Sequence, residues 1–252
     1  MDQELRKKRI LEELNEHEFV NLQEFVKEFD VSEMTIRRDF NELEKLGLLI
    51  RKYGGAVRTE AIETMFSFNR RVECNSDKKE AICRKASEMI ENHDSIFIDC
   101  GTTLFRLAHF IKKKRIRVIT NSLPVVSELM NCPSIRLSFI GGDIMRDRQA
   151  AYGRIAEKTI QDYSANKAFL GVDGVSLAHG LSSFDEHEAM VTRMMAKQAL
   201  TVYLLCDSSK IEKDSFFRFA PIDLVQYLIT NEFSDIELRD EYIRAGVQII
   251  TS

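Results

Sequence analysis

The chain has 252 residues, of which 44% are hydrophobic and 30% are charged, and its formal net charge is -4. This composition is typical of a globular protein long enough for a small domain and a larger one. No stretch approaches the ~20 apolar residues of a membrane-spanning helix, and the charged N-terminus lacks the apolar segment of a signal peptide. Five widely spaced cysteines without a Cys-x-x-Cys pair argue against a disulfide framework and a zinc site. We therefore expect a cytoplasmic protein without a metal or cofactor.

A short amphipathic helix is predicted within residues 20–30. Its apolar positions recur with the spacing of one buried helix face: Leu22, Phe25, Val26 and Phe29. Asn21, with Glu24 three residues later, is a typical helix start, because both side chains can bind free backbone N–H groups. The helix is expected to stop at Asp30.

A second helix is predicted directly after a tight turn, with Ser32 as its N-cap. Its apolar positions again share one face: Ile36, Phe40, Leu43 and Leu46. Arg37, Arg38 and Asn41 then point away from that face. Two short helices joined in this way form a helix-turn-helix.

A β-hairpin is predicted immediately after the second helix. The segment Leu48 to Arg51 has the composition of a strand, Gly54 and Gly55 are turn residues, and a second short strand follows to Val57. A hairpin in this position is the wing of a winged helix, and winged helices bind double-stranded DNA. The first domain is therefore predicted to bind DNA through residues 1–58.

The candidates for DNA contact are polar side chains of the second helix and the wing. They are Ser32, Thr35, Arg37, Arg38, Asn41, Arg51, Lys52 and Tyr53. An Arg fork can bind guanine O6 and N7 in the major groove, while hydroxyl and basic groups hold phosphates. In the alternative interpretation, Arg37 and Arg38 only solvate an exposed helix face and pair with Asp39 or Glu42.

Net charge does not decide between these interpretations, since residues 1–60 hold eleven Lys and Arg against fourteen Asp and Glu. The basic residues are clustered locally: Arg6 to Arg9, Arg37 with Arg38, and Arg51, Lys52 and Arg58. Such clusters could follow a phosphate backbone if the fold brings them to one side.

The run from Val31 to Leu43 (VSEMTIRRDFNEL), followed by Gly47-Leu48-Leu49 and Gly54-Gly55-Ala56, closely resembles the N-terminal domain of the DeoR family of bacterial transcriptional regulators. One position departs from the family, because Tyr53 stands where its members usually carry His before two glycines. Tyr53 keeps a flat ring with a polar tip but cannot carry positive charge. The preference for DNA sequence at the wing is therefore expected to differ.

Residues 59–76 are interpreted as a linker, because they combine mixed charge with scattered aromatic residues and show no clear period. A second domain is predicted over residues 77–252. Its helices alternate with short apolar strands, which indicates an α/β domain with a mostly parallel sheet.

The elements of this second domain follow from the apolar runs and their spacing. Strands are predicted at residues 95–98, 117–119, 136–140, 168–172, 201–205, 227–229 and 248–250. Helices are predicted at residues 104–111, 125–130, 154–163, 186–197 and 235–244, and around Ile82, Ala86, Met89 and Ile90. Ligands of such sheets bind beyond the carboxyl ends of the strands.

Small, hydroxyl, amide and charged residues follow these strand ends and predict a pocket for a phosphorylated, hydroxyl-rich effector. The candidates are Asp99, Gly101, Thr102, Thr103, Asn121, Gly141, Gly142, Asp173 and Lys210. The loop before the helix at 104–111 offers free N–H groups and two hydroxyls to a phosphate. Lys210 could neutralise the phosphate, and three side chains could bind sugar hydroxyls: Asp99, Asn121 and Asp173. The alternative is that these are only turn residues.

The second domain also resembles the DeoR family, whose sensor domain is similar to ribose-5-phosphate isomerase. The segments that carry the resemblance are Asp99 to Thr103, Thr120 to Pro124, Gly141-Gly142, Lys167 to Gly174, His179 to Leu181 and Asp207 to Lys210. The resemblance implies a regulator that represses a sugar-catabolic operon and leaves DNA when a phosphorylated metabolite binds.

The isomerase carries a catalytic Asp followed directly by Glu, whereas here Asp173 is followed by Gly174. A carboxylate needed for proton transfer is therefore missing, and we expect no catalytic residue and no enzyme activity. Asp185, His187 and Glu188 suggest a metal site, but an acidic first helical turn is the favoured interpretation, because no second ligand cluster completes a site.

The favoured hypothesis is a repressor released from operator DNA by a phosphorylated sugar or sugar alcohol, and assembled as a homo-oligomer, dimer or tetramer. Two alternatives stay open. One is a phosphosugar isomerase-like enzyme with an attached DNA-binding domain, which a turnover assay would reveal. The other is an architectural DNA-binding protein whose second domain only oligomerises, which phosphorylated sugars would not stabilise.

Overall fold

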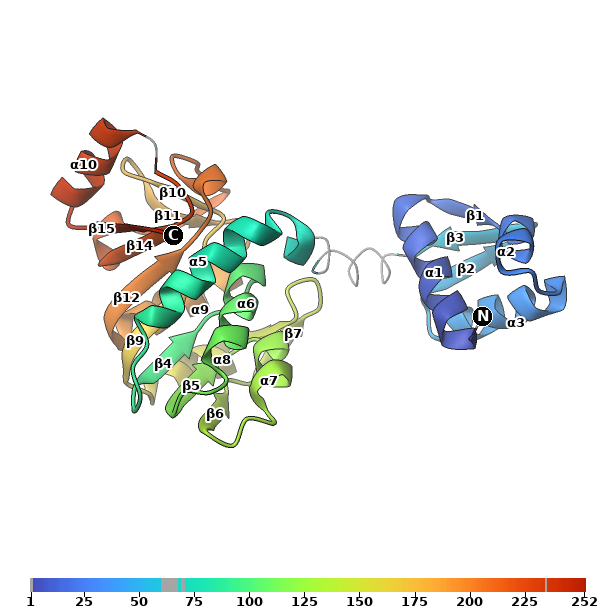
Figure 1. Cartoon of the computed structure of the whole chain (residues 1–252), viewed down its shortest axis with the longest axis horizontal. Helices are drawn as coiled ribbons and strands as arrows, with labels where there is room; N and C mark the ends of the chain where they lie inside the picture. Colours follow the sequence, from blue (N-terminus) through green and yellow to red (C-terminus); the bar gives the residue numbers. More distant parts are fainter. Residues whose placement is uncertain (1, 60–67, 69–70, 234) are drawn as a thin grey trace. The chain divides into compact units, whose positions relative to one another are not determined.

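The computed structural model of the chain describes residues 2–59, 68, 71–233 and 235–252 (Figure 1). It contains two compact units, Met1–Arg71 and Val72–Ser252. Much of the predicted linker, residues 60–67 and 69–70, lies outside the described residues. Each unit has a buried apolar core of its own.

The N-terminal unit combines helices with a small antiparallel sheet. Its elements are α1 (Gln3–Glu16), β1 (Phe19–Asn21), α2 (Leu22–Phe29), α3 (Glu33–Lys45), β2 (Leu49–Lys52) and β3 (Gly55–Arg58). Strand β3 lies between β1 and β2 and pairs with both. Helices α2 and α3 confirm the predicted helix-turn-helix, and the β2–β3 hairpin confirms the predicted wing.

Both predicted helix starts are confirmed by side-chain caps. The Asn21 side chain accepts a hydrogen bond from the N–H of Gln23 at 2.8 Å, and Ser32 accepts one from Thr35 at 3.3 Å. Asp30 ends α2 in the left-handed region (φ 50°), which produces the tight turn before α3. Leu46 is an exception to the predicted buried face, because α3 ends at Lys45 and the Leu46 side chain is exposed.

Helix α1 was not predicted, and an ion pair buries one of its charged residues against α3. Nε of Arg6 lies 2.8 Å from Oδ2 of Asp39, and the side chain of Gln3 donates a further hydrogen bond to Asp39. Arg6 is 5% exposed and Asp39 is 0% exposed. Arg6 is therefore unavailable to a phosphate backbone, which corrects its inclusion in the basic cluster Arg6 to Arg9.

A parallel sheet forms the centre of the C-terminal unit. Its strands are β4 (Ser95–Ile98), β5 (Ile116–Thr120), β6 (Ile135–Phe139), β9 (Ala165–Leu170), β12 (Ala199–Leu205), β14 (Tyr227–Thr230) and β15 (Gln248–Thr251). The seven strands lie in the order β15-β14-β12-β9-β4-β5-β6, and every neighbouring pair is parallel. All seven predicted strands are confirmed, with bounds that shift by a few residues.

Helices connect these strands, and the predicted positions are confirmed. They are α5 (Ser76–Glu88), α6 (Thr102–Ile111), α7 (Leu123–Leu129), α8 (Gly153–Gln161), α9 (Glu186–Lys197) and α10 (Ile236–Arg244), with the 3-10 turns η1 (Ser208–Lys210) and η2 (Ile222–Leu224). Ile96 and Ile98 of β4 belong to one apolar core and Phe97 to another. Alternate residues of the strand therefore pack on opposite faces of the sheet.

The direction in which strands are added to the sheet reverses between β4 and β9. The chain places β5 and β6 on one side of β4, and then β9, β12, β14 and β15 on the other. The connections after β4 and β9 consequently leave the sheet in different directions at the carboxyl ends of these strands, and in open α/β sheets a ligand crevice forms at such a point. Any ligand of this sheet is expected there.

Short antiparallel elements at the sheet ends were not predicted. Strands β7 (Asp143–Met145) and β8 (Ala150–Tyr152) form a hairpin, and β10 (Gly174–Ser176), β11 (Gly180–Ser183) and β13 (Phe217–Ala220) form a small sheet. Within the described residues, no helix combines the length and apolar character that crossing a membrane requires.

Candidate functional site

The exposed face of α3 carries the predicted DNA-contact residues. Arg37 and Arg38 are exposed, and Asn41 is half-buried. Nη2 of Arg37 lies 2.6 Å from Oε1 of Glu33, and hydrogen bonds from Arg37 lower the pKa of Glu33 below its usual value. The alternative interpretation paired the arginines with Asp39 or Glu42. Arg37 instead pairs with Glu33, and the buried Asp39 pairs with Arg6. The pKa of Glu42 is lowered by a hydrogen bond from Lys7 and also by the charge of Arg38, as that interpretation expects for Arg38.

The wing presents Arg51, Lys52 and Tyr53 as exposed side chains. Nε of Arg51 lies 2.7 Å from Oε2 of Glu44, which attaches the hairpin to the end of α3. The following Gly55 is required by packing, because a Cβ at that position would lie 2.0 Å from the carbonyl oxygen of Val20. The chain therefore holds the wing against β1 and α3.

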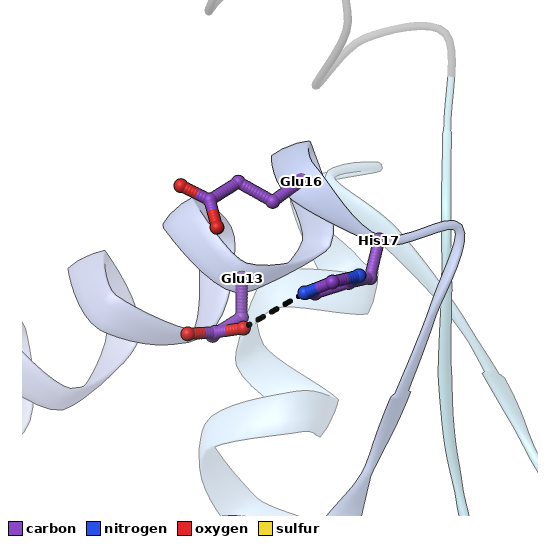
Figure 2. Close-up of side chains that lie close together, drawn as sticks. All are labelled: Glu13, Glu16 and His17. Atoms are coloured by element: carbon purple, nitrogen blue, oxygen red, sulfur yellow. Dashed lines mark ion pairs between the residues drawn. The ribbon is translucent and has the colours of Figure 1, made fainter.

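One group of possible metal ligands lies at the end of α1, where Figure 2 shows Glu13, Glu16 and His17 together. Nε2 of His17 lies 3.7 Å from Glu13, and Arg9 also pairs with Glu13. These contacts are ordinary for a partly exposed helix end. Asp185 caps α9 by accepting hydrogen bonds from the N–H groups of His187 and Glu188, both at 2.9 Å. That finding confirms the helix-start interpretation of this segment.

Asp99 lies at the carboxyl end of β4 but is directed into the protein. Its side chain accepts hydrogen bonds from the N–H of Cys100 at 2.8 Å, the hydroxyl of Thr192 at 2.8 Å and the N–H of Gly171 at 3.4 Å. Burial raises the pKa of Asp99 to about 6. Asp99 is 1% exposed, and its hydrogen bonds join the end of β4 to α9 and to the residue after β9. The prediction that Asp99 binds a sugar hydroxyl is therefore corrected to a role in holding these elements together.

Asn121 and the glycine pair after β6 also serve the protein itself. Asn121 is fully buried, and its amide donates to the carbonyl of Ala151 at 3.1 Å. A Cβ on Gly142 would lie 2.3 Å from the carbonyl oxygen of Tyr152. Asn121 and Gly142 therefore fix the β7–β8 hairpin against the sheet, and the predicted sugar contact of the buried Asn121 is corrected to a role in packing. A Cβ on Gly141 would meet nothing within 4 Å, and effector binding by Gly141 and Gly142 stays a prediction.

The loop between β4 and α6 has the features of an anion site. Gly101 precedes α6 with φ 115°, and no side chain caps the free N–H groups of the first turn. Nζ of Lys79, on α5, donates to the hydroxyl of Thr102 at 3.0 Å. Burial and then the charge of Lys210 lower the pKa of Lys79, so the two ammonium groups repel each other.

Lys79 was missed by the sequence analysis although a signal was present. It stands three residues before the apolar position Ile82, so helical periodicity places it on the buried face of α5. The side chain is 5% exposed. A lysine on the buried face of α5 whose Nζ reaches the first residue of α6 is a candidate ligand for a phosphate.

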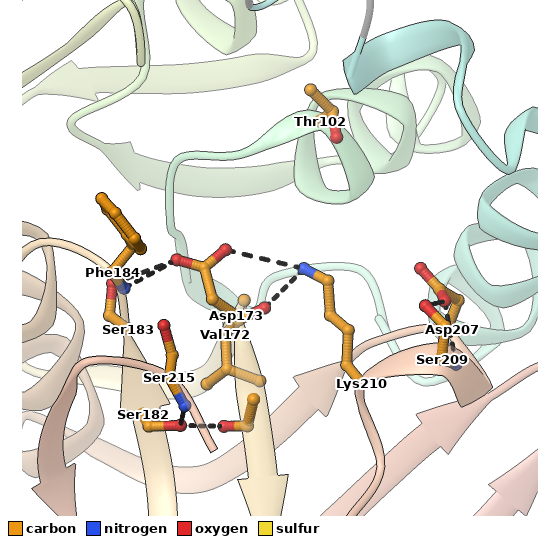
Figure 3. Close-up of polar contacts among 12 residues, drawn as sticks. Thr102, Val172, Asp173, Ser182, Ser183, Phe184, Asp207, Ser209, Lys210 and Ser215 are labelled. Atoms are coloured by element: carbon orange, nitrogen blue, oxygen red, sulfur yellow. Dashed lines mark hydrogen bonds and ion pairs between the residues drawn. The ribbon is translucent and has the colours of Figure 1, made fainter. Parts of the chain in front are cut away.

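Lys210 and Asp173 lie together beside the carboxyl end of β9 (Figure 3). The Lys210 ammonium donates to the carbonyl of Val172 and lies 4.0 Å from Oδ1 of Asp173. Burial alone would raise the pKa of Asp173, but Arg148, the N–H of Phe184 and Lys210 together lower it. Asp173 therefore stays ionised and places an acceptor at the crevice.

A second charged group beyond Asp173 was also missed. Nη2 of Arg148, from the β7–β8 loop, donates to Oδ2 of Asp173 at 3.2 Å, and its Nε lies 3.1 Å from Oε2 of Glu188. Glu188 is in turn 3.7 Å from Sγ of Cys100, which lies 2.9 Å from the hydroxyl of Tyr152. Burial raises the pKa of Cys100 well above its usual value, so it is a protonated packing residue.

Known protein families match the sequence of this chain in both of its units. Residues 74–232 match the DeoR C terminal sensor domain, and residues 6–61 match the DeoR-like helix-turn-helix domain. The HTH-type transcriptional regulator IolR of Bacillus subtilis (strain 168) is 33% identical over 227 residues, covering 90% of this chain and 88% of that protein.

Two further relatives are repressors by name. The lactose phosphotransferase system repressor of Streptococcus mutans serotype c is 34% identical over 242 residues, covering 93% of this chain and 96% of that protein. The glycerol-3-phosphate regulon repressor of Escherichia coli (strain K12) is 30% identical over 233 residues, covering 92% of each chain.

Among solved structures, the chain resembles ribose 5-phosphate isomerase A from Methanocaldococcus jannaschii, with a TM-score of 0.40, 18% identity, and coverage of 54% and 55% of the two chains. That likeness is too slight to carry a conclusion about activity. The family matches cover both units, and the relatives align over most of their length. The chain therefore belongs to the DeoR family of transcriptional regulators.

Proposed function

We propose that this regulator represses a sugar-catabolic operon and leaves its operator when a phosphorylated sugar or sugar alcohol binds the C-terminal unit. The names of the relatives support the repressor role, since they include the glycerol-3-phosphate regulon repressor and the lactose phosphotransferase system repressor. A ligand that binds the DNA-free protein more tightly than the DNA-bound protein must weaken DNA binding. The factor by which the ligand lowers the affinity for DNA equals the factor by which DNA lowers the affinity for the ligand.

The observation that carries the proposal is the contact of Lys79 with the first residue of α6, a helix start without a side-chain cap, under the influence of the Lys210 charge. Lys79 binds Thr102, Lys210 lies close enough to depress the pKa of Lys79, and the first turn of α6 offers N–H groups. A dianionic phosphate would pair with both ammonium groups and relieve their repulsion. The phosphate is assigned to Gly101, Thr102, Thr103, Lys79 and Lys210, with Asp173 as an acceptor for a hydroxyl.

DNA recognition is assigned to α3 and the wing, and Arg37→Ala and Arg38→Ala are each expected to weaken operator binding by roughly 1 to 3 kcal/mol. Arg37 must leave Glu33 to reach a base, but an exposed ion pair of this kind is weak. Fluorescence anisotropy with labelled operator DNA at fixed salt measures the change. Lys45→Ala, at the opposite end of α3, is the matched control. Operator binding by both arginine variants at the parent's affinity would contradict the assignment.

The regulator is expected to act as a homo-oligomer, at least a dimer on DNA. One winged helix reads few base pairs, so two linked half-sites are needed for strong binding to a single genomic site. Multi-angle light scattering of the protein alone and on its operator measures the subunit number. A monomer under both conditions would contradict this part of the proposal.

An isomerase activity is disfavoured by the backbone around Gly174. A Cβ at that position would lie 2.4 Å from the carbonyl oxygen of Lys213, so a second carboxylate after Asp173 would not fit without backbone movement. We therefore propose a sensor domain without catalysis. A turnover assay with ribose 5-phosphate tests this alternative directly.

The proposal as a whole is tested with DNA from the region upstream of the regulator's own gene. A panel of sugar and polyol phosphates of three to six carbons is added to the protein–DNA complex, and both the release of DNA and the thermal stability of the protein are followed. We expect at least one compound to release DNA and to raise the unfolding temperature. Strong DNA binding without a response to any compound would favour the architectural alternative.

A further inference from the structure

The group formed by Arg148, Asp173 and Glu188 is a buried charge cluster that packing alone does not explain. The side chains are 13%, 27% and 13% exposed, so all three charges have lost most of their water. Replacing a buried ion pair by apolar residues of similar size is often neutral or stabilising. A cluster of this kind at the edge of a ligand crevice is therefore a candidate for recognition.

The cluster brings together three elements beside the point where the strand order reverses. Arg148 comes from the loop between β7 and β8, Asp173 from the segment between β9 and β10, and Glu188 from the first turn of α9. The two oxygens of Asp173 face different partners, since Oδ2 binds Arg148 and Oδ1 lies 4.0 Å from Nζ of Lys210. Asp173 thus stands between the lysine of the phosphate site and the guanidinium.

The guanidinium of Arg148 is held in place and still has donors to offer. Its Nε faces Glu188 and its Nη2 binds Asp173. Among the residues that the structure describes, none accepts a hydrogen bond from its Nη1. A planar guanidinium that is hydrogen-bonded through Nη2 and ion-paired beside Nε presents its remaining N–H groups in a restricted direction, which suits an oxygen acceptor on a ligand.

We propose that Arg148 binds the end of the effector opposite its phosphate, and so selects sugar or polyol phosphates that carry a hydroxyl or carbonyl oxygen at that end. The assignment rests on the proposed phosphate site. Nη1 of Arg148 donates to the distal oxygen, while Oδ1 of Asp173 accepts from a hydroxyl in the middle of the carbon chain. Arg148 thereby determines specificity, and Lys79 and Lys210 supply affinity for the phosphate that all candidate effectors share.

The experiment compares two kinds of probe on the full-length protein by titration calorimetry. Inorganic phosphate reports the phosphate site alone, and the panel of three- to six-carbon sugar and polyol phosphates reports both ends. Arg148→Lys keeps the charge but loses the fork, and Arg148→Met with Glu188→Gln keeps the net charge without a guanidinium. Arg146→Met, an exposed residue of the same loop, is the matched control.

For the compound that the parent binds best, both Arg148 variants are expected to lose roughly 10- to 100-fold in affinity, as for a hydrogen bond to a charged group. Their affinity for inorganic phosphate should stay within about two-fold of the parent, which also shows that the site is still folded. Arg146→Met should match the parent with both probes.

Three results would overturn the assignment, and they are distinguishable. If the parent binds a sugar phosphate and both Arg148 variants bind it equally well, Arg148 has no part in recognition although the phosphate site stands. A loss of affinity for inorganic phosphate as large as that for the sugar phosphate would likewise assign Arg148 to charge balance alone. If the parent binds neither phosphate nor any panel compound, the proposed effector site itself is wrong, and this assignment falls with it.

Discussion

Lys210→Ala and Thr102→Val are each expected to remove the response to the effector at concentrations that fully release the parent from DNA. Lys210 would supply one of two ammonium groups at the proposed phosphate site, and Thr102 holds the other by accepting from Nζ of Lys79 at 3.0 Å. Losing one charge-assisted contact weakens binding by about 1.5 to 3 kcal/mol, or roughly 10- to 150-fold. Anisotropy of labelled operator DNA, titrated with the releasing sugar phosphate, measures the shift.

Operator affinity without effector should stay at the parent value in both variants, because neither residue belongs to the DNA-binding unit. Lys213→Ala is the matched control, since Lys213 is an exposed lysine three residues after Lys210. Removing Lys210 is also expected to raise the pKa of Lys79, whose value the neighbouring charge depresses. A normal effector response in both Lys210→Ala and Thr102→Val would mean that the phosphate binds elsewhere.

The sequence was most informative where local chemistry and fold coincide. Ser32 and Asn21 were predicted as helix caps because short polar side chains can satisfy free N–H groups, and both do so. The strands of the parallel sheet were predictable because burial on both faces requires continuous apolar runs, as in Ser95–Ile98.

Residue type gave less information about the direction of side chains within the site. Asp99 and Asn121 follow strands as a ligand site would require, yet both are buried and bind the protein's own backbone. Nothing in their local sequence distinguishes an inward carboxylate or amide from an outward one. That difference is set by packing between β4, β8 and α9, which are distant in the chain.

The contacts of Arg148 could not be predicted from the sequence for a second reason. Arg148 lies in a hairpin whose strands have three residues each, too short for an alternating pattern to be read. Asp173, which binds Arg148, lies 25 residues further along the chain. Glu188, the other partner of Arg148, lies further still, on α9. Contacts of this range depend on the order of strands in the sheet, which the strand pattern alone does not fix.

Asp39→Ala is expected to destabilise the DNA-binding unit by about 3 to 5 kcal/mol, because it leaves the guanidinium of Arg6 buried without its carboxylate. The pair joins α1 to the recognition helix through contacts of 2.8 and 3.3 Å, and both side chains are nearly inaccessible to water. A loss of this size is a large part of the total stability of a small domain. Operator binding should be lost with the fold.

Urea unfolding of the full-length protein, followed by circular dichroism and by operator binding, measures the effect. Glu42→Ala is the matched control on the same helix, since the Glu42 side chain is 40% exposed and its pair with Lys7 should contribute little to the stability. Replacing both partners, as in Arg6→Met with Asp39→Leu, should recover much of the stability, because no buried charge is then left alone. A loss below about 1 kcal/mol in Asp39→Ala would show that α1 does not depend on this pair.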